Sequence, residues 1–281
     1  LLWLRWLLSL RTREVRSVFK VEGLYKTFEA HSANEVHAIN GVDLVINDGD
    51  FITVIGSNGA GKSTLLNLLS GSVIADSGKI YLDDLDVTKM PEYKRAKYIG
   101  RVFQDPRVGT CPDLSIIENM SLASRRGKLR TLRLGMSKGE KEEYIEDLKT
   151  LNLGLEDRPK SKAGLLSGGQ RQALTLLMAT LVKPRLLLLD EHTAALDPGT
   201  AAVVLSKTEE IINKHNLTAF MVTHNMKDAL RYGNRLIMMD KGRIVLDISG
   251  EEKKKLTVAD LLKMFENVTG NEIVNDSVLL A

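Results

Sequence analysis

Residues Gly56 to Ser63 read GSNGAGKS and match the spacing G-x-x-x-x-G-K-[ST] between an apolar run and a predicted helix. Glycines let backbone N–H groups turn inward around phosphate oxygens, and the positive end of the following helix dipole adds attraction. Lys62 is expected to reach the β and γ phosphates, and Ser63 to ligate Mg²⁺. The sequence therefore predicts a site for ATP with Mg²⁺, built from Gly56, Ser57, Asn58, Gly59, Ala60, Gly61, Lys62, Ser63 and Thr64.

A pair of acids follows a second apolar run, RLLLLDE, in which Asp190 and Glu191 come directly after four leucines. Such a run is typical of a strand buried on both faces of a parallel sheet, and the acid then emerges at its carboxyl end. We expect Asp190 to face the Mg²⁺ held by Ser63, and Glu191 to orient or deprotonate the attacking water.

Short apolar runs place these motifs on strands. We predict strands at FKVEGLYKTF, VHAINGVDLVI and DFITVIG before the glycine loop, and at GKIYLDDLDVT and YIGRVFQD after it. Further strands are predicted at RLLLLD, TAFMVTH and RLIMMD, alternating with helices near residues 201–215 and 225–233. This alternation predicts a mainly parallel sheet that is covered on both faces.

The segment from Ser115 to Leu153 differs from this pattern, because it combines helical periodicity with dense charge and contains no convincing strand. We interpret it as part of a helical lobe inserted into the α/β core. The tail GEEKKKLTVADLLKMFENVTGNE is predicted to be a capped helix, since Thr257 precedes Asp260 with N-cap spacing.

Shortly before Asp190, the residues Leu166 to Gln170 read LSGGQ and open a predicted helix, QRQALTLLMATL. A hydroxyl and bare N–H groups at a helix N-terminus form a second anion site, although the chain already has one phosphate loop. With this motif the chain resembles the ABC ATPase superfamily from Phe19 to about Gly250. In that family the second site, here Ser167, Gly168, Gly169 and Gln170, faces the ATP of a partner subunit.

The resemblance implies roles for four more residues. Gln104 in VFQD resembles the glutamine that touches Mg²⁺ and links the core to the helical lobe, and His224 resembles the histidine that contacts the γ-phosphate. Asp197 resembles the acid that communicates between sites across the dimer. Phe28 aligns with the aromatic residue that stacks on adenine, and Tyr25 is a nearby competitor.

His192 and Thr193 follow the acids where the family frequently has Pro-Thr. We expect His192 to have a surface or packing role and not to be the catalytic base. The expected catalytic residues are Glu191, His224, Gln104 and Lys62, and the expected metal-holding residues are Ser63, Gln104 and Asp190.

The resemblance implies a P-loop NTPase fold of ABC type, in the α/β class: a mainly parallel sheet core with an N-terminal antiparallel β-subdomain and an inserted helical subdomain. We expect the ATPase domain at residues 19–250, with its helical subdomain at about 105–180. Residues 1–18 are expected to be an extension, either disordered or a remnant, and residues 251–281 a helical tail.

Composition limits the class of partner. The 281 residues carry a formal net charge of only +3, which does not suggest nucleic acid binding. A single cysteine, Cys111, allows no internal disulfide and favours a reducing compartment. The apolar run Leu1 to Leu10 reaches about half of the roughly 20 residues that a spanning helix needs.

Together these features imply a peripheral ATPase on the cytoplasmic face of the membrane. Its expected partners are separate permease subunits, a second copy of itself or a homologous ATPase, and an extracytoplasmic solute-binding protein. DEHTAALDP and GLLSGGQRQ, with flanking runs, resemble tryptophan/tyrosine-type uptake systems, so we expect import of an amino acid or similar solute. The alternatives are efflux, lipoprotein release or mechanotransmission, and an ABC ATPase without a transport role.

Overall fold

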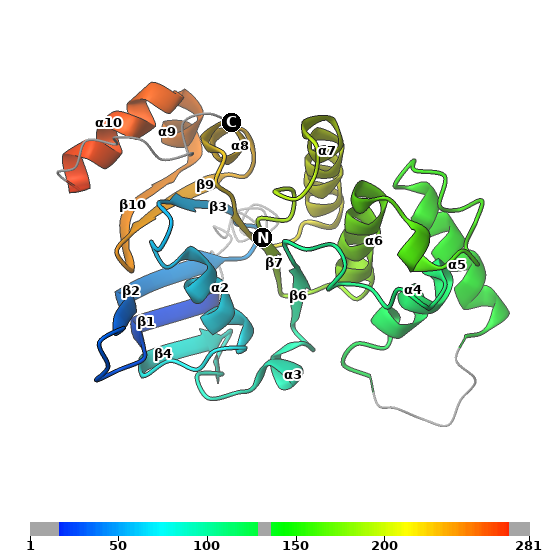
Figure 1. Cartoon of the computed structure of the whole chain (residues 1–281), viewed down its shortest axis with the longest axis horizontal. Helices are drawn as coiled ribbons and strands as arrows, with labels where there is room; N and C mark the ends of the chain where they lie inside the picture. The colour runs from blue at the N-terminus through cyan, green and yellow to red at the C-terminus, as the bar shows by residue number, and fades with distance from the viewer. Residues whose placement is uncertain (1–16, 129–135, 270–281) are drawn as a thin grey trace, which may run out of the picture.

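The computed structural model describes residues 17–128 and 136–269. Two sheets and a lobe of helices make up the molecule (Figure 1). The strands are β1 (Ser17–Phe28), β2 (Val36–Asn47), β3 (Phe51–Gly56), β4 (Ser77–Leu82), β5 (Leu85–Asp86), β6 (Ile99–Val102), β7 (Leu186–Asp190), β8 (Ala219–Val222), β9 (Arg235–Asp240) and β10 (Arg243–Ser249). The helices are α2 (Lys62–Ser70), α3 (Glu92–Arg95), α4 (Ile116–Ser124), α5 (Lys138–Lys149), η1 (Ala163–Leu165), α6 (Gly168–Leu181), α7 (Pro198–His215), α8 (Met226–Arg231), α9 (Gly250–Lys255) and α10 (Val258–Thr269).

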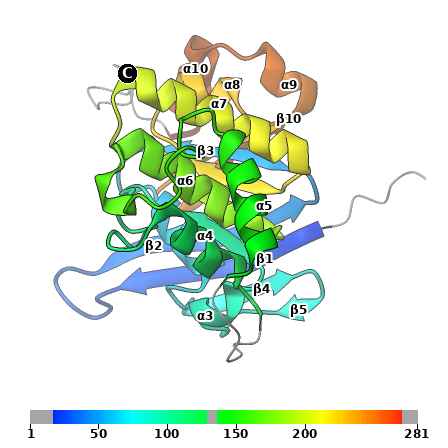
Figure 2. The same ribbon diagram turned by 90° about the vertical axis from the view of Figure 1, so that its right-hand side faces the viewer.

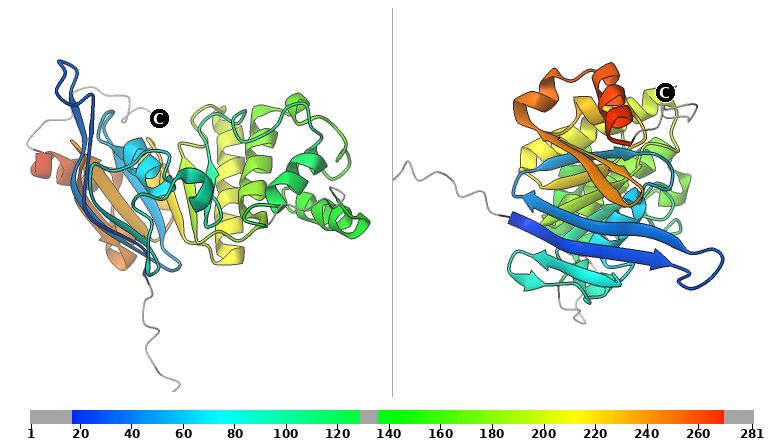
Figure 3. Two further views of the ribbon diagram at one scale, coloured as in Figure 1. Left: turned by 90° about the horizontal axis from the view of Figure 1, so that it is seen from below. Right: turned by 90° about the vertical axis from the view of Figure 1, so that its left-hand side faces the viewer.

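The smaller sheet has the order β2-β1-β4-β5, and all its neighbouring strands are antiparallel. Its strands lie side by side in the right-hand view of Figure 3. Phe19, Leu24, Ile39 and Ile46 point from its inner face into a core that also contains Leu65 and Leu69 of α2. The predicted N-terminal antiparallel subdomain is confirmed, and it packs directly on the helix that follows the glycine loop.

The larger sheet has the order β10-β9-β3-β8-β7-β6 and is parallel except for the β10–β9 pair. Leu186 to Leu189 on β7 are fully buried, as expected for a strand covered on both faces. The strand β10 is absent from our predictions. Its signal was a hairpin turn at Lys241 and Gly242, both with positive φ, followed by the apolar alternation of RIVLDIS.

The helical lobe contains α4, α5, η1 and α6; it lies beside the two sheets in Figure 1 and in front of them in Figure 2. Ser115 and Ser137 start α4 and α5 with capping boxes, in which the glutamate three residues later bonds back to the serine N–H. Buried Leu174 and Leu177 of α6 share one core with Met120 and Leu148 of the lobe and Leu187 of β7. Thus α6 joins the lobe to the main sheet.

The C-terminal tail forms two helices, α9 and α10, where one was predicted. The predicted cap at Thr257 is confirmed, because its hydroxyl accepts from the Asp260 N–H and its own N–H donates to the Asp260 carboxylate. Lys253 of α9 is buried and donates to the carbonyl oxygens of Tyr232 and Gly233. Across residues 17–128 and 136–269, none of the helices has the length and apolar content to span a bilayer, and Leu1 to Leu10 lie outside these ranges.

Candidate active site

The phosphate loop follows β3 and is held in a shape that only glycine tolerates at two points. Gly56 has φ 152°, and a Cβ atom there would stand 2.2 Å from the Met239 carbonyl oxygen. Gly61 has φ 99°, and a Cβ atom there would stand 2.4 Å from the Ala38 carbonyl oxygen. The loop is therefore pressed between β9 and β2, and α2 begins immediately after it.

Lys62 lies across this loop. Its side chain is only 6% exposed, and Nζ donates to the carbonyl oxygens of Gly56 at 2.8 Å and Ser57 at 3.0 Å. Burial lowers the pKa of Lys62, and the nearby charge of Glu191 opposes this shift. The ammonium group is thus held at the position where phosphate oxygens would enter the loop.

Ser63 and Asp190 meet beside the loop. Burial raises the pKa of Asp190, while the charge and hydrogen bond of Arg101 and the nearby Ser63 hydroxyl oppose this shift. A hydroxyl beside a carboxylate suits a hard cation such as Mg²⁺, which binds proteins through few ligands and keeps its other oxygens from phosphate and water. Among residues 17–128 and 136–269 there is no cluster of three or more His, Cys, Asp or Glu side chains that could hold a metal ion.

Glu191 and His224 form a pair over the ends of β7 and β8, with 3.8 Å between Oε2 and Nδ1. The contact with His224 lowers the pKa of Glu191, and the contact with Glu191 raises the pKa of His224. Glu191 has φ 42°, a left-handed conformation that costs an ordinary residue on the order of 1 kcal/mol. This strained backbone directs the acid toward the histidine and the lysine of the loop.

Gln104 lies beyond the end of β6 and is exposed, and its side chain makes no hydrogen bond to another described residue. The preceding Phe103 carbonyl oxygen accepts from Gln172 Nε2 of α6 at 2.9 Å. The loop with Gln104 is therefore tied to the helix that starts at the LSGGQ motif, while its role with Mg²⁺ stays a prediction.

The LSGGQ motif lies at the start of α6. Ser167 is the N-cap, with its hydroxyl accepting from the Gln170 N–H at 3.3 Å and its N–H donating to Gln170 Oε1 at the same distance. Ser167 and Gly168 are exposed, whereas a Cβ atom at Gly169 would stand 2.1 Å from Thr200 Cγ2 of α7. Asp197 caps α7 by accepting from the Thr200 N–H at 3.0 Å. Two helix N-termini thus meet here.

This second cluster is separate from the first. Within the ranges 17–128 and 136–269, no hydrogen bond or ion pair joins Ser167, Gly168 or Asp197 to Lys62, Asp190 or Glu191. The structure therefore places Lys62, Ser63, Asp190, Glu191 and His224 around the phosphate loop, without a contact from Gln104 among the described residues, and it places Ser167 and Asp197 at the starts of α6 and α7.

The two candidate adenine-stacking residues lie on β1. The ring of Phe28 is 39% exposed at the end of the strand, and Lys26 Nζ lies 5.5 Å from its centroid. Tyr25 is 46% exposed, and its hydroxyl stands over Gly41 of β2. Because β2 contacts the phosphate loop at Ala38, either residue can be near a bound base, and the assignment of Phe28 stays a prediction.

His192 is fully buried, so the predicted packing role is confirmed and the surface role is wrong. Its Nε2 lies 3.0 Å from Thr208 Oγ1, and that hydroxyl donates to the Val204 carbonyl oxygen, so the imidazole is the donor. Burial lowers the pKa of His192 to about 4, which keeps the ring neutral. The sequence analysis missed Arg101, which contacts Asp190; its signal was one charged residue inside the β6 strand.

Comparison with known proteins identifies the class of ATPase to which this chain is similar. A family model described as "ABC transporter" matches residues 39–194 of this chain. The tyrosine transport ATP-binding protein of Clostridioides difficile (strain R20291) is 45% identical over 250 residues, covering 89% of this chain and 99% of the relative. The phosphonates import ATP-binding protein PhnC of Lactococcus lactis subsp. cremoris is 31% identical, covering 85% and 96%.

Solved structures agree with the fold. The ADP conformation of MJ1267, an ATP-binding cassette of an ABC transporter, superposes with a TM-score of 0.73 at 26% identity, covering 89% of this chain and 98% of that one. A dimeric post-hydrolysis state of the cassette MJ0796 with ADP and Pi has a TM-score of 0.69 at 28% identity, covering 82% and 98%.

The fold and site define a P-loop ATPase with an inserted helical lobe. More specifically, the chain belongs to the ABC transporter family and is an ATP-hydrolysing subunit of such a transporter.

Proposed function

We propose that this chain powers the uptake of an amino acid or similar small solute through separate permease subunits, from the cytoplasmic face of the membrane. The observation that carries the proposal is the 45% identity, over 89% of the chain, to a protein described as a tyrosine transport ATP-binding protein. Relatives described as import ATP-binding proteins for phosphonates and for spermidine and putrescine support the direction of transport.

In the proposed catalytic site, the phosphate loop binds the phosphates of ATP, and Lys62 moves from the loop carbonyls to the phosphate oxygens. Ser63 and Asp190 would hold Mg²⁺, which supplies charge neutralisation for phosphoryl transfer when bound. Glu191 accepts a hydrogen bond from the attacking water, and His224 contacts the γ-phosphate. The 3.8 Å approach of Glu191 and His224 supports this division of roles.

In the proposed dimer, two copies close head to tail. Ser167 and the N–H groups at the start of α6 would bind the γ-phosphate held by the partner copy, since the helix dipole favours an anion there. The exposed position of Ser167 and Gly168 supports this role. Because ATP binds the closed form better than the open form, binding closes the dimer and hydrolysis opens it.

Transport itself is tested in proteoliposomes that contain this ATPase and the permease encoded next to it, with a solute-binding protein outside and ATP enclosed inside. We expect uptake of radiolabelled aromatic amino acids that requires enclosed ATP and is lost in Glu191→Gln. ATP-dependent release of preloaded solute, without uptake, would instead assign the chain to an exporter.

A further inference from the structure

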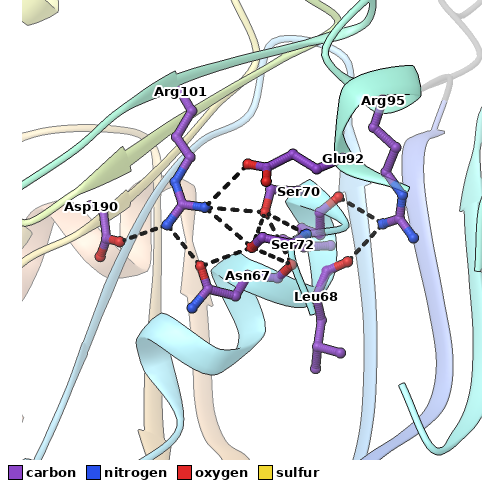
Figure 4. A network of polar contacts seen from close by, with 9 residues as sticks. Asn67, Leu68, Ser70, Ser72, Glu92, Arg95, Arg101 and Asp190 are labelled. Carbon is purple, nitrogen blue, oxygen red and sulfur yellow. Dashed lines mark hydrogen bonds and ion pairs between the residues drawn. The ribbon is translucent and has the colours of Figure 1, made fainter. Parts of the chain in front are cut away.

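Arg101 is a partly buried cation to which the sequence analysis gave no role. It lies on β6, one of the strands of the parallel sheet, and its side chain is only 14% exposed. An arginine with so little exposure is usually paired, so its partners indicate its role. Figure 4 shows its guanidinium group between Asp190 and the C-terminal end of α2.

On one side the guanidinium group binds the end of α2. Nη2 donates to Asn67 Oδ1 at 2.7 Å, and Nη1 donates to the hydroxyls of Ser70 at 3.3 Å and Ser72 at 3.4 Å. Glu92 is a weaker partner, with 3.8 Å between Oε1 and Nη1. This same helix begins with Lys62 and Ser63, so Arg101 fixes the far end of the helix that carries the phosphate-binding residues.

On the other side the same Nη2 atom donates to Asp190 Oδ2 at 3.1 Å. Asp190 is 16% exposed, so this charge-assisted hydrogen bond is shielded from water and stronger than one on the surface. The guanidinium carbon also lies 4.6 Å from the centroid of Phe103, which precedes Gln104. One planar group therefore contacts β7, α2 and the loop with Gln104.

We propose that Arg101 is a positioning residue that holds Asp190 against Ser63, so that the two side chains are ready to receive Mg²⁺ with ATP. The inference rests on the proposed role of Asp190 and Ser63 in holding the metal. Arg101 binds one carboxylate oxygen and anchors α2 through Asn67, which sets the separation between strand β7 and helix α2. Partners of this kind orient metal ligands, and their loss costs about 10–100-fold in metal affinity.

The experiment measures Mn²⁺ binding to the ADP-saturated protein, from the loss of the free Mn²⁺ signal in electron paramagnetic resonance. Arg101→Ala is expected to weaken Mn²⁺ binding by about 10-fold or more, with ADP affinity in chelator unchanged. Arg101→Lys should recover part of this loss, because a lysine can reach one of the two partners. Asn67→Ala should shift the Mn²⁺ affinity in the same direction by less, since Asp190 keeps its contact.

A matched control is Arg185→Ala, which removes an arginine–aspartate pair, Arg185 with Asp83, just before β7, the strand that ends at Asp190. Its Mn²⁺ affinity should equal that of the wild type. Unchanged or tighter Mn²⁺ binding in Arg101→Ala would overturn the proposal, and so would an equal loss in the Arg185 control. If Arg101→Ala does not fold, the Arg101→Lys and Asn67→Ala titrations decide. Absence of protein-bound Mn²⁺ in the wild type would instead refute the proposed metal site.

Discussion

The phosphate-loop region and the LSGGQ region are both built on helix N-termini, yet they differ in what surrounds them. Around α2 lie a lysine held by the loop carbonyls, the Ser63 hydroxyl, two acids and a histidine, and one of the acids, Glu191, approaches the histidine within 3.8 Å. Around α6 and α7, Ser167 and Asp197 face outward and bond within their own caps. In our proposal the first region carries out hydrolysis, whereas the second offers donors to a nucleotide outside the subunit.

The same local feature, a helix N-terminus, therefore occurs in two different surroundings. The positive end of a helix dipole attracts an anion in either region. Only at α2 do a lysine and a pair of acids stand opposite it. We therefore propose that the chemistry takes place at α2 and that α6 recognises a second subunit's nucleotide.

The largest expected effect is on the phosphate-loop region. Glu191→Gln keeps the shape of the side chain and removes the base, so ATP hydrolysis should fall by about 10²–10⁴-fold. Binding of a fluorescent ATP analogue should persist, because Lys62 and the loop are intact. Phosphate release and fluorescence titration measure the two quantities. Turnover close to that of the wild type would move the base elsewhere.

The next effect is on the LSGGQ region. Ser167→Arg should reduce hydrolysis by about 10²–10³-fold, comparable to the removal of a transition-state donor, because a bulky cation blocks closure. Nucleotide affinity of the monomer should stay unchanged. The matched control is Ser137→Arg, which removes the same kind of capping box from α5. If Ser167→Arg weakens nucleotide binding to the monomer as much as it reduces hydrolysis, the two regions do not have separate roles.

His192 links the regions, since it follows Glu191 and bonds to Thr208 of α7. Its pKa falls from 6.5 to about 4 in the folded state, so it stabilises the fold fully above pH 6.5 and loses this contribution as pH falls toward 4. This pKa difference corresponds to about 3 kcal/mol of unfolding free energy between the two ends of the pH range. Urea titrations across this pH range measure the free energy of unfolding, which should fall less toward pH 4 in His192→Gln than in the wild type. An identical pH profile for the variant would contradict the buried neutral ring.

The smallest expected effect is at Asp197, where two variants distinguish its role as the N-cap of α7 from a role of its charge across the dimer. Asp197→Asn retains an N-cap side chain, so its melting temperature should match that of the wild type, whereas Asp197→Ala should lose about 2–4 °C. Both variants should slow hydrolysis by the same few-fold factor if the charge acts across the dimer. If hydrolysis slows only in Asp197→Ala, the variant with the lower melting temperature, then Asp197 acts only as a helix cap.

Sequence reasoning succeeded where local pattern determines position. Four leucines predicted that Asp190 would emerge from a buried strand, and the Thr257 cap was visible from spacing alone. It missed β10, whose turn residues were overlooked. The sequence did not reveal that Lys253 is buried or that Arg101 is partly buried and paired, because their partners lie 21 and 89 residues away along the chain. Long-range contacts of this kind follow from packing, which no single stretch of sequence encodes.

The central claim is that the LSGGQ region of one copy completes the ATP site of another. It is tested most directly by the molar mass of Glu191→Gln, measured by size-exclusion chromatography with light scattering. Mg²⁺ is removed by chelator, and samples with and without saturating ATP are compared. We expect ATP to convert the monomer into a dimer. A variant that binds ATP and remains a monomer would contradict the claim.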